Sequence, residues 1–152
     1  MATHRRRNHI VNKMDVICDT SFIMVLCYDP IKNTDFLKIK FGKITYLIYP
    51  SVIRELTRIT HTGKIKRSNI AKLSLEIIKK EVENNNFQIM SDINNLHSTR
   101  EVDLQLLEIS LQKKYPLATI DKNLIKKALK NGSDIITLKN NKIIYLQSNY
   151  HF

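Results

Sequence analysis

The sequence has few of the residues that bend or cross-link a chain. Only three glycines, three prolines and two cysteines occur among 152 residues, and tryptophan is absent. So few glycines and prolines argue against a disordered chain or one built of repeated turns. Cys18 and Cys27 form no CxxC pair, which leaves no basis for a zinc site or a disulfide framework. We therefore expect a reducing, cytoplasmic compartment, with Cys18 as a buried apolar residue.

Long apolar runs are also missing. No segment is apolar for long enough to span a membrane, so we expect no membrane partner. The charged amino terminus has no apolar stretch behind it and does not resemble a secretory signal. With 43% hydrophobic residues, the chain can still form one domain with a substantial core. We predict a basic N-terminal arm over residues 1–12 and a single domain over residues 13–152.

Acidic residues are scarce beside basic ones. The chain has 25 lysines and arginines against 14 acids, a formal net charge of +11, and its lysines are spread along the sequence. This balance fits binding to nucleic acid or another polyanion, although a lysine-rich surface can also serve solubility alone. Arg5, Arg6 and Arg7 lie in the arm, which is either a leader without structure or a nucleic-acid contact. Lys122 is a further candidate contact.

Short apolar segments alternate with amphipathic ones along the rest of the chain. This alternation predicts a three-layer α/β fold with a mainly parallel sheet. Strands are expected at 16–18, 46–49, 87–90, 117–120, 135–138 and 143–146, the last two joined by a hairpin turn at Asn140-Asn141. Helices are expected at 20–27, 32–41, 50–62, 66–83, 101–114 and 122–130. Thr20 or Ser21 is the expected cap of the first helix, and Ser51 that of the third.

Four acids lie at the edges of these apolar segments, where a carboxylate is normally avoided. Asp19 and Asp121 each follow a strand, Glu55 is one turn into a helix, and Asp103 opens another helix. Open parallel sheets bind ligands outside the carboxyl ends of their strands, so the four acids can converge there. Taken singly, Asp121 can be a helix N-cap and Asp103 can favour a helix N-terminus.

An acidic cluster inside a basic protein suggests a divalent cation acting on a polyanion. Mg²⁺ and Mn²⁺ prefer carboxylate oxygens and water. Such ions can activate water and neutralise a leaving oxygen, so a nuclease needs neither histidine nor cysteine. Without a cation, the clustered carboxylates would repel one another and raise at least one pKa. Glu108 lies on another side of the helix from Asp103 and is a weaker candidate.

The order of these motifs resembles that of PIN-domain nucleases. The segments that carry the resemblance are residues 16–22, 50–56, 102–103, 118–124 and 132–138. They cover nearly the whole globular part, from residue 14 to about 146. The chain is most similar to small archaeal PIN proteins related to the ribosomal-RNA-processing branch, and also to VapC-type toxins.

The resemblance implies an α/β/α sandwich with a parallel sheet of five strands, to which the C-terminal hairpin would add a strand. It implies a Mg²⁺- or Mn²⁺-dependent endoribonuclease, with Asp19, Asp103 and Asp121 as metal ligands. Glu55 would complete the cluster directly or through water. The hydroxyls of Thr20, Ser21 or Thr119 would orient these carboxylates or bound water.

Partners and biological role stay open at this point. The implied partners are RNA, an antitoxin or a ribosome-assembly protein, and a second copy of the chain. Three functions compete: a ribosomal-RNA-processing endoribonuclease, a VapC-type toxin, and a non-catalytic RNA-binding or assembly factor on a PIN scaffold. Because the four acids are all present, we favour an enzyme.

Overall fold

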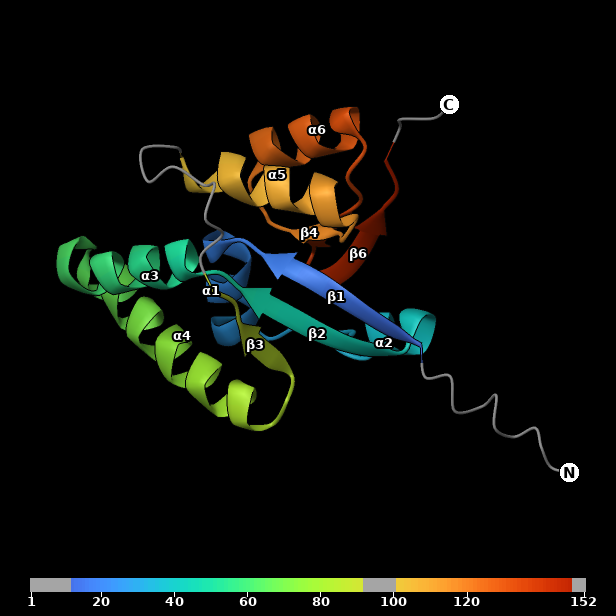
Figure 1. The fold of residues 1–152 in the computed structure, drawn as a ribbon. Coiled ribbons are helices and arrows are strands. Elements are labelled where there is room, and N and C mark those ends of the chain that lie inside the picture. The colour runs from blue at the N-terminus through green and yellow to red at the C-terminus, as the bar shows by residue number, and fades with distance from the viewer. Residues whose placement is uncertain (1–11, 92–100, 149–152) are drawn as a thin grey trace, which may run out of the picture.

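A computed structural model describes residues 12–91 and 101–148 (Figure 1). The predicted arm with Arg5, Arg6 and Arg7 therefore lies outside the described residues, apart from Asn12. A central sheet separates two groups of helices. Helices α5 (Val102–Lys113) and α6 (Lys122–Asn131) cover one face, and α1 (Thr20–Tyr28), α3 (Pro50–Thr62) and α4 (Ile65–Glu83) lie on the other. The predicted three-layer architecture is confirmed.

The sheet has six strands in the order β3-β2-β1-β4-β5-β6. The first five are parallel, and β6 pairs antiparallel with β5. This confirms the mainly parallel sheet and the added C-terminal strand. The strand bounds are β1 Lys13–Cys18, β2 Lys43–Ile48, β3 Phe87–Ile89, β4 Leu117–Ala118, β5 Ile135–Lys139 and β6 Lys142–Leu146.

The hairpin between β5 and β6 turns where the sequence predicted. Asn140 and Asn141 both adopt positive φ angles, 54° and 62°. Asparagine tolerates this left-handed conformation better than most residues, and two successive positive φ angles suit the twist of a tight hairpin.

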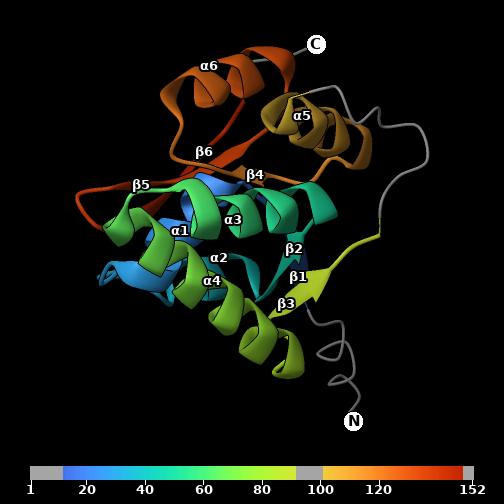
Figure 2. The same cartoon turned by 90° about the vertical axis from the view of Figure 1, so that its left-hand side faces the viewer.

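Strand β1 occupies the point where the strand order changes direction. It pairs with β2 on one side and with β4 on the other, so the chain's two halves diverge from this strand. Ile17 aligns with Leu47 on β2 and with Leu117 on β4, and all three side chains are buried. In an open parallel sheet, such a switch point leaves a crevice outside the carboxyl ends of the strands. Figure 2 views the molecule toward this end.

The strands are apolar because helices cover both of their faces. Val16, Ile17 and Cys18 in β1, and Ile135 and Ile136 in β5, are fully buried. Burial of each such aliphatic side chain is worth about 1.5–3 kcal/mol. Continuous burial along a strand is typical of parallel sheets in α/β proteins.

Several local predictions were wrong. Helix α1 is capped by Asp19 rather than by Thr20 or Ser21, and α3 has Tyr49 as its N-cap, with Ser51 inside the helix. Pro50 explains the second shift, because proline fits the first helical turn, where its missing N–H is not needed. Helix α2 (Phe36–Phe41) begins four residues later than expected. The Asn33 side chain instead donates to the Ile143 carbonyl and accepts from the Ile143 N–H, at 2.9 and 2.7 Å.

Within the described residues, no helix is both long enough and apolar enough to cross a membrane.

Candidate active site

Asp19 is the centre of a hydrogen-bond network at the carboxyl end of β1. Its side chain is only 8% exposed. One carboxylate oxygen accepts from the Thr20 N–H at 2.9 Å. The other accepts from the hydroxyls of Ser21, at 2.9 Å, and Thr119, at 2.7 Å. A carboxylate in so dry a place needs these donors, because burial without partners is costly.

The pKa of Asp19 reflects these opposing influences. Burial, the largest effect, raises the pKa of Asp19 above its usual value, and the nearby Asp103 carboxylate raises it further. Hydrogen bonds from Thr119, Ser21 and the Thr20 backbone act in the opposite direction. The net shift is upward, so desolvation outweighs the donors. A cation beside Asp19 would offset both unfavourable effects.

Thr119 joins the two strands across the switch point. It follows β4, is fully buried, and its Oγ1 accepts a hydrogen bond from the Asp121 N–H at 3.0 Å while donating to Asp19. The Asp19 N–H donates to the Ala118 carbonyl at 2.9 Å, which extends the pairing of β1 and β4 to the site. The threonine thus fixes the Asp19 carboxylate relative to the start of α6.

Glu55 reaches the network through Thr20. The Thr20 Oγ1 donates to Glu55 Oε1 at 2.6 Å, and Arg58 forms an ion pair with Glu55 Oε2 at 3.8 Å. Glu55 is 28% exposed, whereas Arg58 is 68% exposed, so this ion pair is screened by water and adds little stability. The hydroxyl contact holds the glutamate toward α1.

Asp103 and Asp121 occupy different positions at the rim. Asp103 is half-buried in the first turn of α5 and close enough to Asp19 to affect its pKa. Asp121 is exposed and accepts hydrogen bonds from the N–H groups of Asn123 and Leu124, at 2.9 and 3.1 Å. The interpretation of Asp121 as an N-cap is confirmed, since it caps α6. Lys122 is exposed beside it.

Hydrogen bonds connect Glu55 and Asp121 to Asp19, whereas Asp103 only lies near it, and the four predicted acids do not form the expected metal-binding cluster in the described residues. In the described parts of the chain, no three histidine, cysteine, aspartate or glutamate side chains stand close enough to hold a metal ion. The donor chemistry still fits a hard cation, because carboxylates and hydroxyls are its preferred partners. The Asp103 charge raises the pKa of Asp19, while Glu55 and Asp121 are connected to Asp19 through Thr20 and Thr119.

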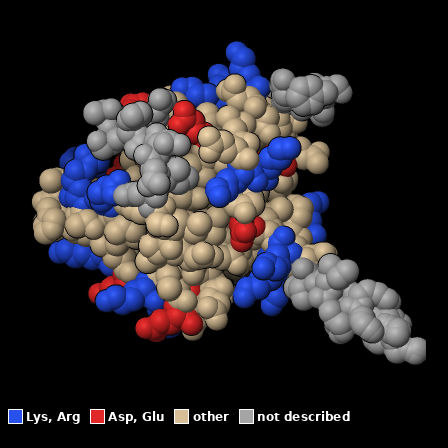
Figure 3. Space-filling model, viewed as in Figure 1, with Lys and Arg blue, Asp and Glu red and all other residues tan. Residues whose placement is uncertain are grey.

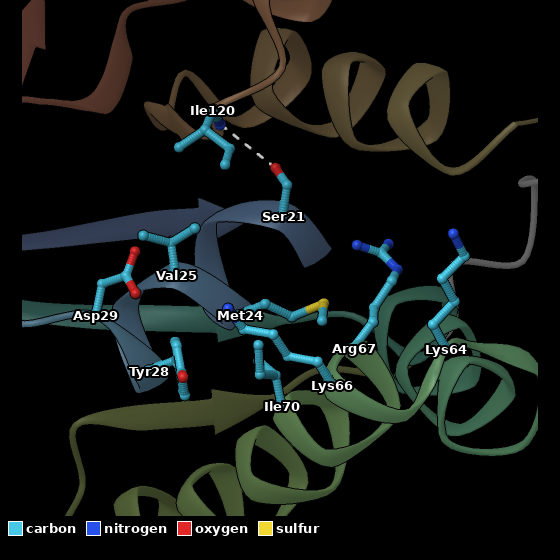
Figure 4. A pocket seen from close by; sticks show the side chains of 10 residues that line it. All are labelled: Ser21, Met24, Val25, Tyr28, Asp29, Lys64, Lys66, Arg67, Ile70 and Ile120. Atoms are coloured by element: carbon cyan, nitrogen blue, oxygen red, sulfur yellow. Dashed lines mark hydrogen bonds between the residues drawn. The ribbon is translucent and has the colours of Figure 1, made fainter.

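A pocket of about 450 Å³ opens beside the network, lined by Ser21 and Ile120 on one side and by residues of α4 on the other (Figure 4). Lys64, Lys66 and Arg67 contribute its basic lining. The sequence showed these cations only as one basic run among several. Their place opposite Ser21 depends on the packing of α1 against α4 and had no local signal.

The fold and the network define a parallel α/β domain with a carboxylate site at its topological switch point. No protein-family model matches the sequence, and no curated protein matches it. The structure is similar to that of the PIN domain endonuclease Utp24, with a TM-score of 0.65 and 22% identity. That similarity covers 90% of this chain and 96% of the other.

A second similar structure is a domain of a functionally unknown protein from Methanocaldococcus jannaschii. It has a TM-score of 0.60 and 15% identity, over 83% of this chain and 91% of that one. With Utp24 as the reference, the chain has the PIN-domain fold, as the sequence motifs predicted.

Proposed function

We propose that this protein is a metal-dependent endoribonuclease that hydrolyses RNA phosphodiester bonds. The observation that carries the proposal is the buried Asp19 carboxylate, fixed by Thr119 and Ser21 at the switch point of a PIN fold. Asp19 also caps α1, but burial beside Asp103 raises its pKa, and raised pKa values of this kind gather at functional sites. A cation at this place favours the ionised form.

The residues present fit Mg²⁺ or Mn²⁺ in the kind of ligand they offer. Asp19 and Asp103 would hold the ion, with Asp121 and Glu55 adding carboxylates directly or through water. When bound, such an ion supplies an activated water and neutralises charge on the leaving oxygen.

The protein's own contribution is orientation. Thr119 and Ser21 fix one oxygen of Asp19, and the Thr20 N–H fixes the other. Thr20 also holds Glu55 through its hydroxyl. Positioning of this kind matters because a misplacement of about 1 Å can cost about a hundredfold in rate. The net charge of +11 favours RNA as the polyanionic substrate, and we propose a structured site such as one in ribosomal RNA.

The direct experiment is incubation of the purified protein with total RNA and Mn²⁺, followed by mapping of the cleaved ends. We expect cleavage by the wild type and none by Asp19→Asn. Glu76→Gln is the matched control, because Glu76 is an exposed acid on α4 outside the network, and it should cleave normally. Equal cleavage by wild type and Asp19→Asn would contradict the proposal.

The position of the cleaved ends separates the biological roles. Ends confined to ribosomal RNA precursors indicate a processing enzyme, and ends in mature transfer or ribosomal RNA indicate a toxin. Tight RNA binding with no cleavage in any RNA would favour an assembly factor instead.

A further inference from the structure

The pocket beside the carboxylate network has an apolar floor. Met24 and Val25 of α1, Ile70 of α4 and Ile120 line it (Figure 4). Its volume of about 450 Å³ is within the range of pockets that bind small molecules. Ser21, whose hydroxyl donates to Asp19, lies at its edge, so the pocket opens directly beside the site proposed for cleavage.

Basic side chains border this floor on the side of α4. Lys64, Lys66 and Arg67 are exposed and line the pocket, whereas Asp29 is its acidic lining residue. In Figure 3, lysine and arginine side chains gather at the left of the molecule, the end at which α3 passes into α4 in Figure 1. Lys64 is the N-cap of α4 and makes no capping hydrogen bond through its side chain. The positive end of this long helix therefore adds to the local potential.

Tyr28 supplies an aromatic surface in the same place. Its side chain is 50% exposed at the end of α1, so one part of the ring is open to a ligand. Lys66 Nζ lies 5.8 Å from the centre of the ring. A second hollow adjoins the first and shares Tyr28, Lys66 and Ile70 with it, and we call the two hollows together the groove. An exposed aromatic ring beside cations is one arrangement by which proteins bind single-stranded nucleic acid.

We propose that this groove binds an unpaired nucleotide next to the cleaved bond. The base would enter the apolar pocket with Tyr28 as its stacking surface, and the flanking phosphates would lie against Lys64, Lys66 and Arg67. The substrate is then single-stranded at this point, because a base inside a duplex cannot enter a pocket. The location of the cleaved bond rests on the proposed function, but the binding of the nucleotide does not require catalysis.

The charge of the groove favours a polyanion over an apolar protein segment. A purely apolar helix of a partner protein would fill the floor but leave three cations facing it. A phosphate backbone neutralises those cations while its base covers the floor. The two kinds of occupant can therefore be distinguished experimentally. Only a nucleotide predicts binding that depends on the base, on the phosphates and on whether the RNA is single-stranded.

The test is fluorescence anisotropy with labelled RNA in the presence of EDTA, so that cleavage plays no part. The probes are a single-stranded oligonucleotide, its duplex, and an abasic backbone of the same length. Tyr28→Ala should weaken binding of the single strand about tenfold and leave the abasic backbone unchanged. Tyr28→Phe should bind like the wild type, since it retains the ring.

Charge is tested by Lys66→Gln, which should weaken binding of both the single strand and the abasic backbone. The matched control is Lys79→Gln, an exposed lysine further along the same helix, which should change neither. Equal effects of Tyr28→Ala on the intact and abasic probes would overturn the base pocket, as would duplex binding as tight as that of the single strand. If the expected binding results are obtained but the wild type cleaves no RNA, nucleotide binding in the groove is supported and the proposed nuclease activity is contradicted.

Discussion

Thr119→Val is the most informative single change, because it removes one oxygen and keeps the shape of the side chain. The Thr119 hydroxyl is fully buried, donates to Asp19 at 2.7 Å and accepts from the Asp121 N–H at 3.0 Å. Valine preserves the packing of the strands. It removes the hydrogen bonds to the Asp19 carboxylate and the Asp121 N–H. The substitution therefore tests the network separately from the core.

The magnitude follows from the two lost hydrogen bonds. A bond to a charged group is worth about 1.5–3 kcal/mol, and a typical neutral bond about 1 kcal/mol. The cost at neutral pH should therefore be about 3 kcal/mol in the free energy of unfolding. It should shrink at acid pH, where Asp19 is protonated and its bond to residue 119 is no longer charge-assisted.

Urea denaturation of the metal-free protein measures this cost. Thr137→Val is the control, since Thr137 is also a buried strand threonine and takes no part in the Asp19 network. We expect the control to lose under about 0.5 kcal/mol. If Thr119→Val loses no more than Thr137→Val, the network does not hold Asp19 in place and the reasoning is refuted.

The stability of the protein should depend on pH and on Mn²⁺, and its affinity for RNA should depend on salt. Because the pKa of Asp19 is raised in the folded state, its contribution to stability is present at acid pH and lost as the pH rises through that pKa. In urea titrations with EDTA, Asp19→Asn should therefore become more stable relative to the wild type as the pH rises from about 4 to about 7. A difference in the free energy of unfolding that does not change with pH would exclude a raised pKa of Asp19. Mn²⁺ at millimolar concentration should raise the melting temperature of the wild type and not of Asp19→Asn, and scanning calorimetry would show it. RNA affinity should fall steeply with salt as counterions are released, and a flat dependence in a titration would show that the charge serves solubility alone.

The general architecture could be predicted because the strands are short, apolar and separated by amphipathic helices. Segments such as Val16-Ile17-Cys18 indicate strands buried on both faces, and Asn140-Asn141 indicated the hairpin. The buried faces of the helices were harder to predict than the strands. Leu111 is 37% exposed and Leu73 is 38% exposed, while Ser110 and Ser74 are buried. The Ser110 hydroxyl donates to the Tyr115 carbonyl and the Ser74 hydroxyl to the Ile70 carbonyl, so both serines are buried without an unsatisfied hydroxyl.

The site was only partly visible in the sequence. Asp19 and Asp121 could be placed at one rim because the ends of parallel strands share it, whereas a role for Thr119 was implied only by the resemblance to PIN-domain nucleases. Asp121 could not be resolved, since a strand-end acid and a helix cap have the same sequence pattern, and the structure shows it capping α6. The groove residue Tyr28 had no local signal. Its role depends on the long-range packing of α1 against α4, which periodicity does not report.

The chemistry of the RNA ends tests the central claim most directly. If water activated at the Asp19 site attacks the phosphate, the wild type with Mn²⁺ should leave 5′-phosphate and 3′-hydroxyl ends. Asp121→Asn should lose cleavage while binding RNA at least as tightly, because it removes a negative charge at the rim. Undiminished cleavage by Asp121→Asn, or 2′,3′-cyclic phosphate ends formed without metal, would contradict the account.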